Sequence, residues 1–163
     1  MAITTLNNRS INRSDTASAD QVWTATSATA SDFQAGGKIL QVVSATSSTA
    51  VSTTSTSFAS TGLTAAITPA STSNKILAMA TSSIYATADA RATIFRDATD
   101  LSGTDSFVVF GSTDVYASMI ILDSPSSTSE LTYEPKFKAV STGTVYWENS
   151  DGTATLTLME ISA

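Results

Sequence analysis

Apolar and polar residues alternate in short segments along most of the chain after residue 36. The clearest segment is 131–139, in which Leu131, Tyr133 and Phe137 alternate with polar or charged residues. Because successive side chains of a strand point to opposite faces, we expect one face of this segment in a core and the other in water. Pro135 lies on the inner face and cannot donate a backbone hydrogen bond, so this strand is expected to be an edge strand or to carry a bulge.

The same pattern, interrupted by clusters of Ser, Thr, Gly, Asp and Pro, predicts about ten strands. They are expected near residues 38–45, 49–58, 63–68, 74–85, 91–96, 106–110, 115–122, 131–140, 144–148 and 153–161. Many short strands with regularly spaced turn signals are typical of sandwiches and barrels, and about ten strands suit a jelly roll. The sequence therefore predicts an all-β fold, a jelly-roll-like antiparallel β-sandwich.

The last two predicted strands are joined by Asn-Ser-Asp-Gly at residues 149–152. An Asp-Gly pair supplies the positive φ of a tight turn, so these strands are expected to form a β-hairpin. By period two, Trp147 and Leu156 face inward, whereas Tyr146 faces outward. Leu131, Phe137, Trp147 and Leu156 are expected to share one apolar interior between two sheets.

Residues 1–35 are mostly polar and end at Gly36-Gly37. This shift in composition predicts two parts, an N-terminal attachment arm at 1–35 and a β-sandwich domain at 36–163. The arm is expected to be extended or partly helical, and a helix would place Arg9 and Arg13 on one face. A tail without structure until it docks is an alternative that the sequence leaves open.

The 163-residue chain contains no cysteine and no histidine. Disulfides, thiol nucleophiles, imidazole bases and the usual zinc ligands are therefore missing together. Serine and threonine, about a third of the residues, are too abundant for any one of them to be nominated as a nucleophile. We expect a protein that is not an enzyme, with no catalytic, cofactor-binding or metal-binding residues and no cofactor.

The formal net charge is −6, and the eight Lys and Arg residues are scattered. Nucleic-acid binding needs a clustered basic face, so no nucleic-acid partner is expected. No apolar run approaches the roughly 18 residues of a membrane-spanning helix, which argues against a membrane partner. The first residues lack a basic stretch followed by an apolar one, so the protein is expected to be made in a cytoplasm.

Acidic residues gather at Asp97, Asp100 and Asp105, and oxygen-rich loops of this kind can hold calcium. The spacing does not fit the twelve-residue calcium loop, which favours a solvated turn. Asp114 and Asp123 are a formal candidate for a glycosidase pair, which requires a separation of roughly 5 to 10 Å. With fourteen acidic residues in the chain, chance pairing is the favoured explanation.

Aromatic residues offer one possible ligand surface. Tyr116, Tyr133, Tyr146 and Trp147 would form a carbohydrate platform if they converged on one exposed face, although core packing is the favoured role. Tyr146 is the best candidate among them for an interface or ligand contact, because Trp147 and Val145 occupy the opposite face of its strand.

Sequence blocks along the whole chain resemble small virion structural proteins of tailed bacteriophages, especially phages of marine bacteria and cyanobacteria. The resemblance lies in MAITTLNNRSINRS at residues 1–14 and GGKILQVV at 36–43. Further blocks lie at 61–70, 73–77, 94–97, 122–125, 143–146 and 158–161.

This resemblance implies a trimeric jelly roll, similar in plan to tumour-necrosis-factor-like domains, with an N-terminal arm attached to the particle. The expected function is that of a homotrimeric capsid decoration or head-fibre protein on the virion, anchored to capsid or tail proteins through residues 1–35. A tail-fibre or receptor-binding component, or a carbohydrate-binding module for a host surface glycan, is the alternative. The family carries no catalytic residues.

Overall fold

The computed structural model describes residues 21–25, 31–35, 38–103, 108–110, 114–148 and 152–163. The chain divides into two units, Met1–Lys38 and Ile39–Ala163, whereas the sequence placed the boundary between residues 35 and 36. In the first unit, β1 (Gln21–Ala25) and β2 (Ser31–Ala35) form a two-stranded antiparallel sheet. The segment expected to be an arm is thus strand where it is described, and Arg9 and Arg13 lie outside the described residues.

The described part of the second unit is built from strands, and none of its residues is helical. No helix long and apolar enough to cross a membrane occurs in the ranges given above. The strands are β3 (Ile39–Ser47), β4 (Val51–Thr53), β5 (Ala59–Ser60), β6 (Ala65–Ile67), β7 (Lys75–Ala86), β8 (Ala90–Arg96), β9 (Thr99–Asp100), β10 (Val108–Phe110), β11 (Asp114–Asp123), β12 (Leu131–Ala139), β13 (Val145–Trp147) and β14 (Ala154–Ile161). The all-β prediction is confirmed.

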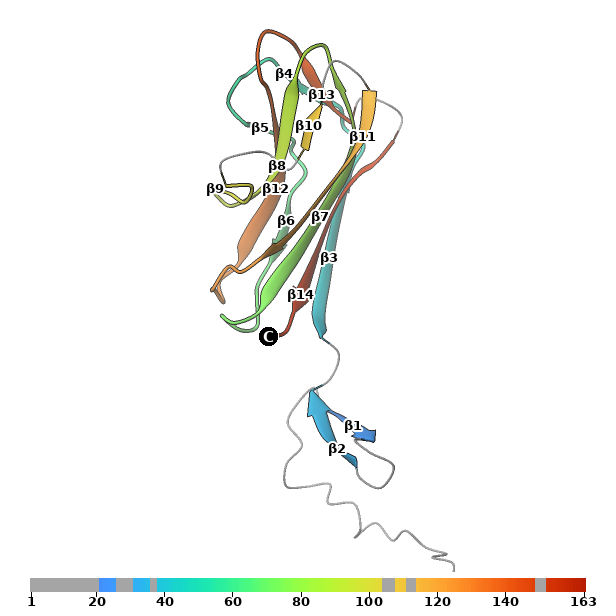
Figure 1. Ribbon diagram of the computed structural model, residues 1–163, viewed down its shortest axis with the longest axis vertical. Helices are drawn as coiled ribbons and strands as arrows, with labels where there is room; N and C mark the ends of the chain where they lie inside the picture. Colours follow the sequence, from blue (N-terminus) through green and yellow to red (C-terminus); the bar gives the residue numbers. More distant parts are fainter. Residues whose placement is uncertain (1–20, 26–30, 36–37, 104–107, 111–113, 149–151) are drawn as a thin grey trace, which may run out of the picture. The chain divides into compact units, whose positions relative to one another are not determined.

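These strands form two antiparallel sheets (Figure 1). The first sheet has the order β10-β8-β12-β5, with β6 beside β12 and β9 beside β8. The second sheet has the order β3-β14-β7-β13-β4. Strand β11 pairs with the edge of β7 that β13 and β14 leave free, so it borders this sheet.

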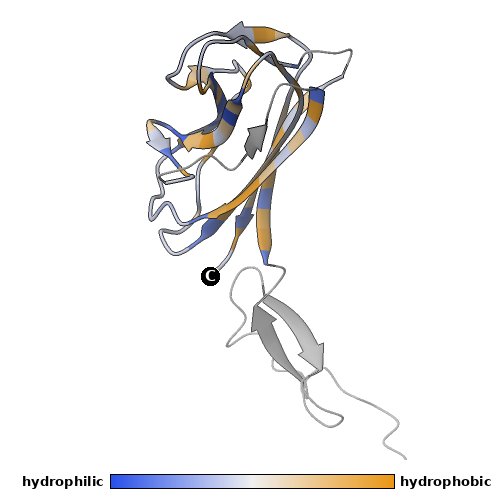
Figure 2. Ribbon diagram, turned by 45° about the horizontal axis from the view of Figure 1, so that its top comes forward, coloured by the Kyte–Doolittle hydropathy of each residue, from blue (hydrophilic) through white to orange (hydrophobic). Residues whose placement is uncertain are grey.

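One apolar core lies between the two sheets. Leu131 and Phe137 from β12 and Trp147 and Leu156 from the second sheet are all buried in the same cluster, as the alternation predicted. The rings of Phe137 and Trp147 join the sheets at a centroid distance of 6.1 Å. The unit is therefore a β-sandwich-like domain, whose strands carry hydrophobic and hydrophilic bands in succession (Figure 2).

The expectation for the strand that contains Pro135 is wrong. Strand β12 is paired on both sides, and its register with β8 continues through Pro135 without a bulge. The irregularity lies instead in the neighbour on the other side of β12, where residues 61–64 separate β5 from β6. The Pro135 carbonyl accepts a hydrogen bond from Thr61 Oγ1 at 2.7 Å, so the edge of Pro135 that lacks an N–H faces this break and no ladder bond is lost.

The expected C-terminal hairpin is also wrong, because β13 and β14 do not pair with each other. Both run antiparallel to the same edge of β7. Eight positions separate Trp147 from Thr155, whereas their partners Ile84 and Thr81 are three positions apart. The surplus residues between β13 and β14 therefore interrupt one long strand rather than reverse it.

Candidate functional site

The second sheet is apolar on both faces. On β7, Ile76, Ala78 and Ala80 are buried in the core, and Leu77 and Met79 point to the opposite side, which we call the outer face. Val42, Met159, Leu77 and Leu122 lie side by side in one register row across β3, β14, β7 and β11. In the next row, Ile120 adjoins Met79. An antiparallel sheet that meets water on one side has polar residues there, so this sheet departs from the usual pattern.

We call Val42, Leu77, Met79, Ile120, Leu122 and Met159 the outer apolar face. Val42, Ile120 and Leu122 expose 55%, 61% and 49% of their surfaces. The other three are partly buried by their neighbours on the sheet. Contiguous apolar surface of this kind marks interaction sites, because its exposure to water is unfavourable.

Hydroxyl groups complete the row that contains Met79 and occupy the next row along the outer face. Thr81 Oγ1 and Thr155 Oγ1 lie 2.8 Å apart on adjacent strands, and Ser44 Oγ and Thr157 Oγ1 lie 3.2 Å apart. Ser118 flanks Thr81 on β11. These rows carry no charge, so the outer face has few groups that would oppose the approach of another apolar surface.

Tyrosines occupy the far end of the outer face. The Tyr85 and Tyr146 rings lie 5.7 Å apart, and Tyr116 lies diagonally across from Tyr85 with 87% of its surface exposed. Tyr133 and Trp147 are core residues, so the four aromatics considered from the sequence form no common platform. The outward orientation of Tyr146 is confirmed. Tyr85 was missed, although its parity with Leu77 and Met79 on β7 could have revealed it.

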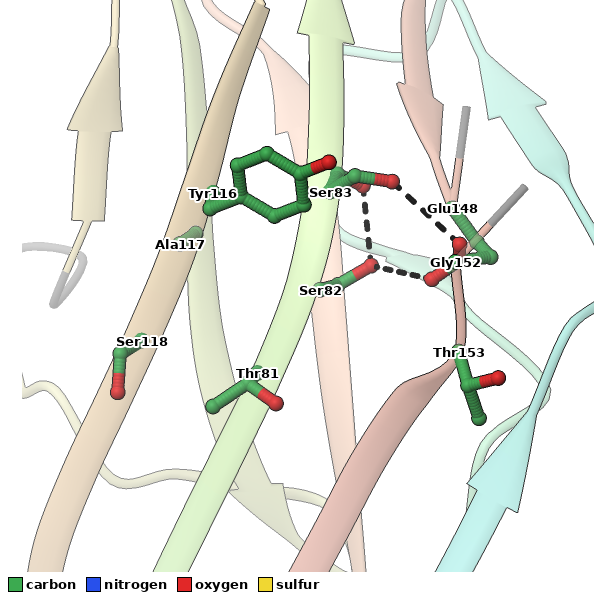
Figure 3. A pocket seen from close by; sticks show the side chains of 9 residues that line it. All are labelled: Thr81, Ser82, Ser83, Tyr116, Ala117, Ser118, Glu148, Gly152 and Thr153. Atoms are coloured by element: carbon green, nitrogen blue, oxygen red, sulfur yellow. Dashed lines mark hydrogen bonds between the residues drawn. The ribbon is translucent and has the colours of Figure 1, made fainter. Parts of the chain in front are cut away.

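A pocket of about 200 Å³ lies beside Tyr116, where β13 and β14 separate along β7 (Figure 3). Its lining includes Thr81, Ser82, Ser83, Tyr116, Glu148 and Thr153. Glu148 follows β13, is 2% exposed, and has a positive φ of 58°. Its backbone N–H donates to the Ser83 carbonyl at 2.8 Å, which holds the residue against β7. No local pattern in the sequence indicates this pocket, because the separation of β13 from β14 follows from their pairing with β7.

The acidic segment at 97–105 forms local turns in its described part. Asp97, with φ 52°, turns the chain between β8 and β9, and its Oδ1 accepts the Thr132 N–H at 3.0 Å. Asp100 Oδ1 accepts hydrogen bonds from Thr93 Oγ1 at 2.9 Å and from Ser102 Oγ at 2.7 Å. Asp105 lies outside the described residues. Over the ranges that are described, no group of three acidic residues has the arrangement of a metal site.

Asp114 and Asp123 stand at opposite ends of β11, a ten-residue strand. At about 3.3 Å per residue they are about 30 Å apart, far beyond the roughly 10 Å limit for a glycosidase pair. Asp123 instead accepts hydrogen bonds from Arg96 Nη1 at 2.5 Å and from the Tyr133 hydroxyl at 2.6 Å. Burial and the bond to Asp123 raise the pKa of the Tyr133 phenol, which keeps it protonated as a structural donor.

A fully buried carboxylate, Glu160, joins the end of β14 to two other segments. Its Oε1 accepts hydrogen bonds from Asn74 Nδ2 at 2.6 Å and from the Ala70 N–H at 2.7 Å, and its Oε2 accepts one from Gln41 Nε2 at 2.6 Å. Burial alone would raise the pKa of Glu160, but these three bonds outweigh it and the pKa is lowered. Its role is therefore structural.

We expect Glu160→Gln to destabilise the domain by about 1–3 kcal/mol at neutral pH, because the amide offers one acceptor oxygen to three donors. Since the folded-state pKa of Glu160 lies below the ordinary 4.5, its contribution is complete above pH 4.5 and is lost as the pH falls through the folded-state value. Urea unfolding at pH 7 and pH 3 should therefore show a difference between wild type and variant that shrinks in acid. Glu130→Gln, at an exposed residue, is the control, and an equal effect of both substitutions would contradict this role.

Comparisons with known proteins identify no family for this chain. No family model matches the chain, and no curated protein is significantly similar to it.

Proposed function

We propose that the chain is a non-catalytic structural protein on the surface of a bacteriophage particle, and that it assembles as a homotrimer through the outer apolar face. The observation that carries the proposal is the second sheet with two apolar faces. One face is used by the core of the domain. The other, with Val42, Ile120 and Leu122, remains exposed in a single copy.

Another copy of the chain is the partner that fits this face best. The chain carries a net charge of −6, so two copies repel each other at long range. The rows that contain Leu77 and Met79 are uncharged, however, so contact through the outer apolar face brings no like charges together. Closed cyclic association of identical subunits is common among soluble oligomers, and it would remove this apolar surface from water.

The strand order supports the finer fold assignment, a jelly roll. If β3 and β4, β5 and β6, and β13 and β14 are each taken as one interrupted strand, and the two-residue β9 is left aside, each sheet has four strands. Numbered along the chain, they follow the order 1-8-3-6 in the second sheet and 2-7-4-5 in the first. Two interleaved Greek keys of this type define a jelly roll, an architecture that viral capsid proteins use.

In this proposal, residues 1–35 are the attachment arm, and the division of the chain at Lys38 supports a separate role for the N-terminal unit. The protein would be made in the host bacterial cytoplasm and incorporated into the virion as a capsid decoration or head-fibre protein. The alternative is a tail-fibre or receptor-binding component. The sequence blocks that resemble phage structural proteins support both versions.

Immunogold labelling of intact particles tests this proposal. Antibodies against residues 39–163 should label the heads of virions at many positions. Label confined to the tail would replace the decoration role by the tail-fibre role. Purified particles that contain none of this chain by mass spectrometry would overturn the proposed function altogether.

A further inference from the structure

The pocket beside Tyr116 occupies an interruption in the second sheet. Strand β13 pairs with β7 as far as Ile84, and β14 takes over at Thr81. Ser82 and Ser83 therefore lie outside both strand ladders on this edge, although the Ser83 carbonyl accepts the Glu148 N–H, and the Glu148 side chain lies beside both serines (Figure 3). The pocket opens where a continuous ladder would have closed the sheet.

Glu148 forms an acceptor that is only partly satisfied. Its two carboxylate oxygens accept hydrogen bonds from Ser82 Oγ at 3.3 Å and Ser83 Oγ at 3.4 Å. Both distances are long for hydroxyl donors, which usually lie at about 2.7–2.8 Å. Among the described residues, no Lys or Arg forms an ion pair with Glu148. A buried carboxylate with weak neutral partners is unfavourable, and it has room for further donors.

The backbone at Glu148 is also strained. A φ of 58° places it in the left-handed region, which costs a non-glycine residue roughly 1–3 kcal/mol. Such strain gathers at sites where the surrounding structure holds a group in place for binding. Here it directs a carboxylate against Ser82 and Ser83 rather than into water.

Tyr116 supplies a flat, exposed ring at the edge of the same pocket. An aromatic ring offers an apolar face, and the phenol offers a polar end. The side-chain polar atoms around the ring are all oxygens, from Thr81, Ser118, Thr153 and the groups that surround Glu148. The pocket thus combines an accessible lining that is mostly apolar with several hydroxyl groups and one carboxylate.

We propose that this pocket binds a single sugar residue of a carbohydrate, with the ring of the sugar against Tyr116 and one of its hydroxyls donating to Glu148. A sugar presents an apolar ring face and hydroxyls that both donate and accept, which matches this lining. A metal cation would require several carboxylates, and the pocket has one. Its volume of about 200 Å³ lies below the roughly 300–1,000 Å³ of pockets for larger ligands, which fits one ring.

This site goes beyond the proposed assembly and is compatible with it. Ile120 in the outer apolar face lies four residues from Tyr116 along β11, which corresponds to about 13 Å. A second copy can therefore cover Ile120 and Leu122 and leave the Tyr116 end of the pocket open, although Thr81 and Ser118 of the lining adjoin the outer apolar face.

Saturation-transfer NMR and calorimetric titration of the full-length protein with free glucose, galactose, mannose and N-acetylglucosamine test the proposal. At least one of these sugars should bind with a Kd of about 1 mM, since one small ring buries little surface. Tyr116→Ala should weaken its binding at least tenfold, and Tyr116→Phe, which keeps the ring face, should change it less than threefold. Glu148→Gln should also weaken binding tenfold, whereas Glu134→Gln on the first sheet should have no effect.

Absence of binding by all four sugars at 50 mM would overturn the proposal, and so would binding that Tyr116→Ala leaves unchanged. Tyr116 is exposed, so its substitution keeps the fold and the test holds even if Glu148→Gln fails to fold. The mass of the oligomer, measured on the same samples, is independent of this outcome. If the protein has the mass of the oligomer but binds none of the sugars, the proposed sugar site is wrong and the proposed assembly is unaffected.

Discussion

The variant Ile120→Asp should be a monomer under conditions in which the wild-type chain forms the trimer proposed above. Ile120 is the most exposed member of the outer apolar face, so an aspartate at this position is solvated in a single copy and leaves the core intact. In the proposed trimer the carboxylate would be buried without a partner, at a cost of several kcal/mol. At about 1.4 kcal/mol per tenfold change, association should weaken by at least a hundredfold. Sedimentation velocity measures this directly.

Val140→Asp is the matched control for this prediction. Val140 is also an exposed apolar residue, but it follows β12 in the first sheet and lies outside the outer apolar face. The same change in charge should leave the oligomer intact there. Dissociation by both substitutions would indicate a general effect of charge, and dissociation by neither would exclude Ile120 from the interface.

The second large effect is expected in the core, where Trp147→Ala should reduce the free energy of unfolding by about 3–5 kcal/mol. The Trp147 side chain is almost fully buried and contacts Phe137 of the opposite sheet, so its removal opens a cavity between the sheets. Its indole N–H has no acceptor among the described residues. Trp147→Phe should therefore cost less than Trp147→Ala, since it loses volume but no hydrogen bond.

Urea unfolding of these variants is best measured in the Ile120→Asp background, because the stability of an oligomer depends on protein concentration. Tyr146→Ala is the control on the same strand. Tyr146 is half-buried on the outer face, where its main contact is the Tyr85 ring, so its loss should cost about 1 kcal/mol. A cost for Trp147→Ala no larger than that for Tyr146→Ala would contradict the shared core.

Period-two alternation predicted the core well, because burial against a second sheet imposes that period on every strand. Leu131, Phe137, Trp147 and Leu156 all face the interior as expected. The same principle explains why the outer apolar face was missed. In β11, residues 119–122 are all apolar. Such a run does not alternate between apolar and polar residues, because both faces of the strand carry apolar side chains. The run was itself the available signal.

Predictions from local turn signals failed where distant pairing or side-chain hydrogen bonds decided the structure. The Asp-Gly pair at 151–152 suggested a hairpin, but β13 and β14 both pair with β7, which lies about seventy positions earlier in the chain. The strand expected at 49–58 is strand only at Val51–Thr53. Beyond it, the N–H groups of Ser55 and Ser57 bind the hydroxyls of Thr53 and Ser55, which removes them from a ladder.

The pocket and the Glu160 cluster depend on contacts between distant segments, and a single sequence contains no local signal for them. Glu160 lies among Leu158, Met159 and Ile161, and an alternating pattern places it on the inner face without saying what satisfies it. Its partners Gln41 and Asn74 lie more than eighty residues away. Glu148 likewise meets Ser82 and Ser83 only because β13 ends beside β7.

If the outer apolar face is buried between copies of this chain, the unaltered full-length protein should be an oligomer in solution. Light scattering coupled to size-exclusion chromatography measures its mass. Three copies of the 16.8 kDa chain correspond to about 50 kDa, and we expect this mass to persist on dilution to the low micromolar range. A mass of 16.8 kDa at every concentration would rule out burial of this face between copies.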